Sequence, residues 1–195
     1  MMDVDGVLVR GRPEDGLPFA TDIERDLGLS LELLRSEFFK PHWSEIVTGR
    51  APLTERLSAV LARIAPELGV ETLIDYWFSK DARVDRDVLN GLAHYRAQNI
   101  KVFLATNQEH RRAAYLMTDL GLADHVDGIV YSAQLGHRKP EQDFYRLATQ
   151  RVGAAPDRIM LIDDTLENVQ GALQFGWQAV HWTGDIALAD ALLHR

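Results

Sequence analysis

Residues 100–107, IKVFLATN, join a short apolar run to a threonine and an asparagine, and this stretch decides the fold. A continuous apolar run of this length predicts a buried strand over residues 100–105. Apolar residues at helical spacing follow over residues 107–120, and the pattern ends at Gly121, a residue type that favours the end of a helix. A strand followed by a helix is the repeating unit of a parallel sheet.

The same unit recurs through the C-terminal half of the chain. Further strands are expected at residues 128–131, 158–162 and 177–182. Further helices are expected from Pro140, where a proline suits the first turn, over residues 166–175, and from Asp185 onward. The repeats predict an α/β fold with a Rossmann-like parallel sheet and helices on both faces. Ligands of such sheets bind beyond the carboxyl ends of the strands.

The segment from residue 18 to residue 81 has a different character. Its apolar residues show helical spacing over residues 21–27, 30–39, 52–64 and 70–78, with few strand signals. We therefore expect a helical cap over residues 18–81, inserted after the first strand. Residues 1–17 and 82–195 would form the core, and the two connections would lie at residues 11–16 and 81–85.

The composition limits the possible partners and chemistry. Among the 195 residues, 46% are hydrophobic and 26% are charged, which is normal for a soluble globular protein. The formal charge of -8 argues against general nucleic-acid binding. The chain has no cysteine, which excludes disulfides, thiolate catalysis and cysteine-based zinc sites. No membrane span or signal peptide is evident, so we expect a cytoplasmic monomer or homodimer without a membrane partner.

Two carboxylates stand two residues apart near the N-terminus, in the stretch MMDVDGV. On an extended strand, Asp3 and Asp5 would point to the same side and repel each other unless a cation or a phosphate lay between them. Gly6 permits a turn and a close approach of the backbone to a ligand. Only Met1 and Met2 precede Asp3, so we expect the neighbouring strands to lack partners along part of their length. Either the native chain starts upstream, or the sheet has adjusted.

Polar residues also follow the other predicted strands. They are Thr106, Asn107, Lys139, Asp163, Asp164 and Asn168. Each one alone has an ordinary explanation, such as a helix cap or a surface lysine. Together, and in this order after DxDGV, they resemble the motifs of the haloacid dehalogenase-like hydrolase superfamily. The resemblance covers essentially the whole chain, and the helical insertion is similar to the family's first-type cap.

The resemblance implies a phosphomonoester hydrolase that uses Mg²⁺ and an aspartyl-phosphate intermediate on a small phosphorylated metabolite, such as a sugar phosphate. Asp3 would be the nucleophile, and Asp5 would be first the general acid and then the general base. The implied Mg²⁺ ligands are Asp3, the backbone carbonyl of Asp5, and Asp164. Asp163 would be a direct or water-mediated helper.

The resemblance also implies a set of phosphate-binding groups. They belong to Gly6, Thr106, Asn107 and Lys139. Lys139 would in addition hold Asp3, and Asn168 would orient the acidic loop. A phosphoryl group in transfer carries charge on three oxygens, so cations and N–H donors suit such a site.

Two alternatives stay open. A phosphomutase of the same fold would share these motifs, and a catalytically weakened binding protein would explain the short segment before Asp3. A dehalogenase is less favoured because a halide leaves without a proton, and the dehalogenating members that this chain resembles lack the aspartate corresponding to Asp5. A receiver domain is also less favoured, because receivers are shorter and carry their acidic pair before the threonine and lysine.

Overall fold

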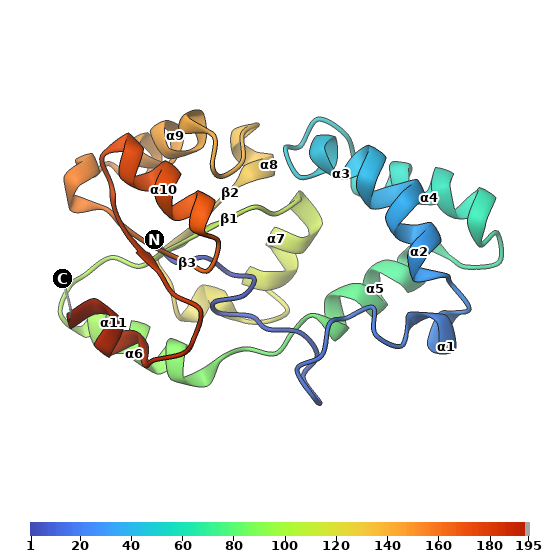
Figure 1. Cartoon of the computed structure of the whole chain (residues 1–195), viewed down its shortest axis with the longest axis horizontal. Coiled ribbons are helices and arrows are strands. Elements are labelled where there is room, and N and C mark those ends of the chain that lie inside the picture. Colours follow the sequence, from blue (N-terminus) through green and yellow to red (C-terminus); the bar gives the residue numbers. More distant parts are fainter. Residues whose placement is uncertain (194–195) are drawn as a thin grey trace.

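One parallel sheet forms the centre of the computed structural model, which describes residues 1–193 (Figure 1). Strand β1 (Phe103–Thr106) pairs with β2 (Gly128–Tyr131), and β3 (Met160–Asp163) pairs with β4 (Gln178–His181). Met2 forms parallel bridges to both β1 and β3, so the order across the sheet is β2, β1, Met2, β3, β4. The predicted parallel α/β fold is confirmed.

A segment of three residues takes the central position of this sheet. The Met2 N–H donates to Phe103 O at 2.9 Å, and Met2 O accepts from Ala105 N at 2.8 Å. On the other side, the Asp3 N–H donates to Ile162 O at 2.9 Å. These bonds carry Asp3 to the carboxyl edge of the sheet.

Two hollows lie beside Met1, where the line of this segment would continue. One has a volume of about 320 Å³ and is lined mainly by apolar residues, including Leu92 and Ile100. The other, of about 740 Å³, reaches from Phe103 to Ile159. The expected lack of strand partners stays a prediction, since β1 and β3 themselves bond to Met1, Met2 and Asp3.

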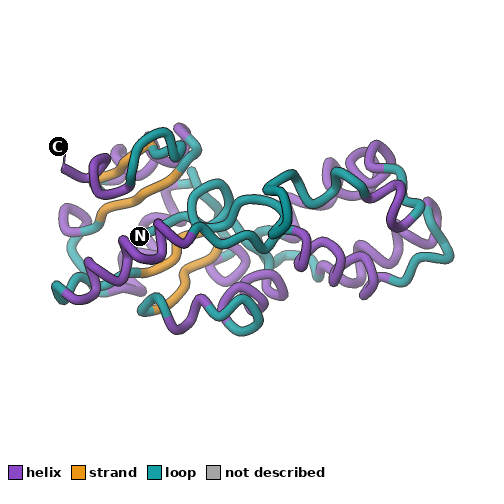
Figure 2. Tube along the Cα trace, turned by 90° about the horizontal axis from the view of Figure 1, so that it is seen from below, coloured by secondary structure: helices purple, strands orange, loops and turns teal. Residues whose placement is uncertain are grey.

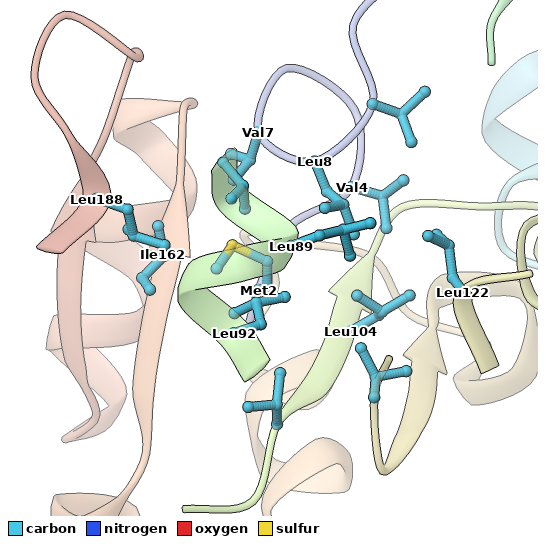
Figure 3. Close-up of a cluster of buried hydrophobic side chains, with 14 of the residues drawn as sticks. Met2, Val4, Val7, Leu8, Leu89, Leu92, Leu104, Leu122, Ile162 and Leu188 are labelled. Atoms are coloured by element: carbon cyan, nitrogen blue, oxygen red, sulfur yellow. The ribbon is translucent and has the colours of Figure 1, made fainter. Parts of the chain in front are cut away.

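One face of the sheet packs against α6 (Arg86–Ala97), α7 (His110–Met117) and α11 (Leu188–Leu193). Leu104 of β1 and Ile162 of β3 point toward this face, where they join Met2, Leu89 and Leu92 (Figure 3). The sequence analysis did not predict α6. Its buried residues, Val88, Leu89 and Leu92, are too few to give a clear helical pattern.

The opposite face packs against α9 (Gln142–Val152) and α10 (Leu166–Phe175) (Figure 1). Ala105 and Leu161 point this way because side chains alternate along a strand. The prediction that α9 begins at Pro140 is wrong. Glu141 is extended and precedes the helix, so Pro140 lies outside its first turn.

Short helical turns complete the core. They are the α-helix α8 (Ser132–Leu135) and the 3₁₀ turns Leu122–Asp124 and Pro156–Arg158. None of the helices within residues 1–193 is long and apolar enough to cross a membrane.

The segment predicted to be a cap forms a separate group of helices beside the core (Figures 1 and 2). Its elements are α1 (Ile23–Leu27), α2 (Leu31–Leu34), a π-helical turn (Arg35–Phe39), α3 (Lys40–Ile46), α4 (Leu53–Ile64) and α5 (Val70–Lys80). They bury a hydrophobic cluster of their own around Phe38 and Trp77. The sequence analysis ended the second helix at Phe39, whereas the chain continues through Pro41 into α3. The π-helical turn lies just before this proline, in keeping with such irregular turns inside helices.

The two connections between cap and core run side by side. The Arg10 N–H donates to Arg83 O at 2.9 Å, and Gly11 O accepts from Ala82 N at 3.1 Å. The boundaries at residues 17/18 and 81/82 stay a prediction, which the separate hydrophobic clusters support.

A buried arginine of α7 joins the core to the end of the cap. The Arg112 guanidinium donates to Phe78 O at 3.1 Å and to Asp81 O, and it lies 3.4 Å from the Asp81 carboxylate. It also stacks near the rings of Phe78 and Tyr115. The side chain is almost completely inaccessible, so no solvent can replace these contacts.

We expect Arg112→Met to lower the free energy of unfolding by about 2–4 kcal/mol, because it leaves buried carbonyls and the Asp81 carboxylate without a partner. Urea denaturation measures this loss. Arg111→Met is the matched control, since Arg111 pairs with Glu71 at the surface and its loss should cost less than about 1 kcal/mol. Equal losses in the two variants would contradict the prediction.

Candidate active site

A buried lysine joins three parts of the sheet edge. The ammonium group of Lys139 donates to Ala105 O at 2.7 Å and to Asp163 Oδ2 at 2.5 Å. It also pairs with Asp3 Oδ1 at 3.0 Å. The three contacts match its three N–H donors. Lys139 thus contacts Asp3. Its role in holding Asp3 for catalysis and its direct contact with a phosphate stay predictions.

Three carboxylates meet beside this lysine. Asp3, Asp163 and Asp164 each place an oxygen within 4.8 Å of the others. Asp3 and Asp163 are buried and Asp164 is half-buried. A set of carboxylate oxygens at this spacing can hold a hard divalent cation. The cluster therefore brings together predicted metal ligands, while the carbonyl of Asp5 stays a prediction as a ligand.

The electrostatics of the cluster favour an additional positive charge. Burial raises the pKa of Asp3, Lys139 opposes this increase, and the charge of Asp163 adds to it. Burial and then the charge of Asp163 also raise the pKa of Asp164. One ammonium group does not balance three carboxylates. The cluster is therefore complementary to an additional positive charge.

Gly6 lies directly against Asp164. Its φ is +82°, and a Cβ at this position would come within 2.0 Å of Asp164 Oδ2. A side chain would therefore displace the carboxylate. The Gly6 N–H donates to Val9 O at 3.0 Å, so the predicted phosphate-binding role of Gly6 stays a prediction.

The side chain of Asn107 fixes the loop that carries Lys139. Its Oδ1 accepts from the Lys139 N–H at 2.8 Å, and its Nδ2 donates to Lys139 O at 3.0 Å. Thr106 is buried at the end of β1, at the same edge of the sheet. The structure brings both residues to the site, and their contact with a phosphate stays a prediction.

Asn168 and the start of α10 hold the acidic loop. Asn168 Nδ2 donates to Asp163 Oδ1 at 3.0 Å, and the Thr165 N–H donates to the same oxygen at 2.9 Å. The Tyr145 hydroxyl in turn donates to Asn168 O at 2.7 Å. The structure brings Asn168 to the acidic loop, and its positioning role stays a prediction.

The carboxyl of Asp5 has a different partner. Gln108 Nε2 donates to Asp5 Oδ2 at 2.5 Å. Asp5 remains accessible to solvent. Desolvation by the surrounding protein atoms raises the pKa of Asp5 to about 6. The charge of Asp81 adds to this increase, and the charge of Arg112 opposes it. Sequence reasoning missed Gln108. The available signal was its place directly after Thr106 and Asn107 at the end of a strand.

The chain matches a known protein family over most of its length. A family model described as haloacid dehalogenase-like hydrolase matches residues 1–176. The chain belongs to this family. Membership and the prediction of a hydrolytic enzyme related to phosphatases are thereby confirmed.

Several proteins resemble this haloacid dehalogenase-like hydrolase. A phosphoglycolate phosphatase of Nitrosococcus oceani is 28% identical over 190 residues, which cover 92% of the chain and 81% of the relative. The fructose-1-phosphate phosphatase YqaB of Escherichia coli is 31% identical over 77 residues, 40% of the chain and 41% of the relative. A structure of a HAD family enzyme from Bacteroides thetaiotaomicron, in complex with magnesium and inorganic phosphate, has a TM-score of 0.81 and 17% identity. That alignment covers 100% of the hydrolase and 97% of the other chain.

The raised pKa values of Asp3 and Asp5 predict how the stability of the metal-free hydrolase depends on pH. Between about pH 4 and pH 6 the folded hydrolase binds more protons at these carboxyls than the unfolded chain does. Their contribution to the free energy of unfolding should therefore fall as the pH rises through this interval. Asp15, whose pKa Arg12 lowers to about 2, contributes with the opposite sign, but mainly below about pH 4.

The test therefore compares the melting temperatures of two proteins. The melting temperature of the wild-type hydrolase minus that of Asp3→Asn, both in EDTA, should decrease from pH 4 to pH 6. Mg²⁺ should raise the wild-type melting temperature more at pH 7 than at pH 5, because the ionised cluster binds the cation. A Mg²⁺ effect of the same size at both pH values would contradict this expectation.

Proposed function

We propose that this chain is a Mg²⁺-dependent phosphomonoester hydrolase that acts on a small phosphorylated metabolite through an aspartyl-phosphate at Asp3. The observation that carries the proposal is the buried contact of Lys139 with both Asp3 and Asp163 at the sheet edge. Relatives that align with most of the chain and are named phosphatases support it. Asp164 completes the acidic cluster beside the nucleophile.

In the first step, Asp3 attacks phosphorus. Val4 N–H and Lys139 both contact Oδ1, which leaves Oδ2 as the attacking oxygen. A bond forms between Asp3 Oδ2 and phosphorus while the bond from phosphorus to the ester oxygen breaks. Asp5 donates its proton to the departing alkoxide. The two contacts on Oδ1 fix the orientation of the nucleophile, which lowers the entropic part of the barrier.

In the second step, water hydrolyses the aspartyl-phosphate. Asp5, now a carboxylate, takes a proton from a water molecule as that water attacks phosphorus. The bond between phosphorus and Asp3 breaks, and inorganic phosphate leaves. A pKa of about 6 suits a group that must be an acid in one step and a base in the next near neutral pH.

The acidic cluster fits Mg²⁺ because its donors are carboxylate oxygens. Asp3, Asp164 and the backbone carbonyl of Asp5 would hold the ion, with Asp163 directly or through water. When bound, Mg²⁺ supplies positive charge that reduces the repulsion between the carboxylate nucleophile and the anionic phosphate.

The names of the relatives favour a small substrate with one phosphate ester, such as a phosphorylated sugar or a phosphorylated hydroxy acid. The phosphomutase alternative uses the same motifs, but it returns the phosphoryl group to a sugar instead of passing it to water. The weakened binding protein would bind the ligand without turnover. The three functions therefore differ in their products.

A panel of phosphomonoesters, assayed with Mg²⁺ for inorganic phosphate, tests the proposal. We expect phosphate release from at least one small ester and loss of release in excess EDTA. Interconversion of hexose phosphate isomers without phosphate release would support the mutase instead. No turnover of any ester, together with binding of inorganic phosphate, would support the weakened binding protein.

A further inference from the structure

Gln108 is the buried side chain of the site that the family motifs do not explain. We propose that Gln108 is a positioning residue, which holds the carboxyl of Asp5 in the orientation that serves proton transfer to the leaving group. This inference rests on the proposed function. It assigns a role to the contact between Gln108 Nε2 and Asp5 Oδ2.

The other site residues do not hold this carboxyl. Lys139 uses its donors on Asp3, Asp163 and Ala105. Among the described residues, Gln108 is the one whose side chain donates a hydrogen bond to the Asp5 carboxyl. Gln108 is only 3% exposed, whereas Asp5 is accessible to solvent. A buried side chain thus holds one that faces solvent.

The backbone of Gln108 is itself fixed on both sides. Its carbonyl oxygen accepts from the Ala133 N–H at 3.1 Å and lies 3.2 Å from the Ser132 hydroxyl oxygen. The next residue, Glu109, caps α7 by accepting from Arg111 N and Arg112 N. These bonds hold the main chain in place, and the buried side chain reaches Asp5 from it. Small displacements of a reacting group cost much rate, so such support matters.

Ser132 extends this support to the cap. Its hydroxyl also contacts Val47 O at 2.5 Å, in the loop between α3 and α4. The Ser132 side chain is completely buried. Gln108 is therefore held at the point where the cap loop meets the core.

The chemistry of an amide suits this task. An amide N–H binds one oxygen of a carboxyl in either protonation state and brings no charge. An ammonium or guanidinium group at the same place would favour the carboxylate and reduce its ability to donate a proton. Gln108 contacts Oδ2 and leaves Asp5 Oδ1 for the proton that is transferred. Without Gln108, the carboxyl could turn toward the buried cation of Arg112, whose charge acts on it.

Two leaving groups separate positioning from general structural support. An alkoxide needs the proton of Asp5 to depart, whereas a dinitrophenolate departs without one. We expect Gln108→Met, which keeps the size but lacks the donor, to lower kcat/KM for an alkyl phosphate by about 10–100-fold. For a dinitrophenyl phosphate, kcat/KM should change less than about threefold. This parameter reports only the steps up to and including the phosphorylation of Asp3, and that phosphorylation needs no acid here.

The same variant should show a lower kcat for the dinitrophenyl ester, with a burst of phenolate, because water attack on the phosphorylated enzyme still needs Asp5 as a base. Gln108→Glu should give the same pattern, since two carboxyls then face each other. Gln134→Met, on an exposed residue of α8, is the control and should leave all rates unchanged.

The outcomes are distinct. Equal losses of kcat/KM for both esters, or no loss for either, would overturn the positioning role while leaving the proposed phosphatase in place. A wild-type protein that turns over neither ester would refute the proposed function and the role of Gln108 with it. A selective loss for the alkyl ester in both variants supports the inference.

Discussion

Asp3→Asn should lower the rate of phosphate release by at least about 10³-fold, because the amide cannot form the covalent bond to phosphorus. The substitution keeps the size of the side chain and an acceptor for Val4 N and Lys139. The steady-state rate with Mg²⁺ and the best ester of the panel measures the effect. Equal rates for the two proteins would contradict the assignment of the nucleophile.

We expect the variant to keep its fold. Asp3→Asn leaves Lys139 paired with Asp163, and it removes one of the carboxylates that repel each other in the cluster. In the absence of metal, the melting temperature of the variant at pH 7 should therefore equal or exceed that of the wild type. An inactive variant that also melts well below the wild type would show damage to the fold instead.

Lys139→Met should lower the free energy of unfolding by about 3–5 kcal/mol and abolish turnover. Lys139 is fully buried, and its removal leaves the buried carboxylates of Asp3 and Asp163 without their cation. Urea denaturation gives the change in stability. Lys101→Met is the matched control, because Lys101 is exposed and its pair with Asp127 should contribute less than about 1 kcal/mol.

A double variant separates stability from catalysis. In Lys139→Met/Asp163→Asn, one of the two unpaired carboxylates becomes neutral, so part of the lost stability should return. Turnover should stay absent, because the variant still lacks the ammonium group that contacts Asp3 and offsets part of its charge during attack. If Lys139→Met proved as stable as Lys101→Met, the central place of Lys139 in the site would be wrong.

Much of the site could be predicted because parallel strands end at a common edge. Thr106 and Asp163 follow apolar strands of ordinary length, and the bridges of Met2 bring Asp3 to the same edge. The sequence alone does not show how a segment as short as Met1–Asp3 can keep its place in the sheet. Its hydrogen bonds to both neighbouring strands explain how it is held in the structure.

The missed features depend on contacts between distant parts of the chain. Gln108 meets Asp5 across 103 positions, and an uncharged amide gives no pattern that singles it out. The sequence does not distinguish Arg112 from the other arginines, because its burial beside Phe78 and Asp81 arises only in the folded chain. The helix α6 has a glycine at residue 91 and few buried positions, so tertiary packing rather than local pattern determines it.

Trapping the phosphorylated enzyme tests the central claim most directly. Asp5→Ala, incubated with a dinitrophenyl phosphate and Mg²⁺, should accumulate the aspartyl-phosphate, because phosphorylation needs no acid and hydrolysis lacks its base. Borohydride reduces an acyl phosphate to an alcohol, so peptide mass spectrometry should then find homoserine at position 3, and only after incubation with the ester. Release of dinitrophenol by an enzyme that carries no reduced residue at position 3, or one at another position, would contradict the account.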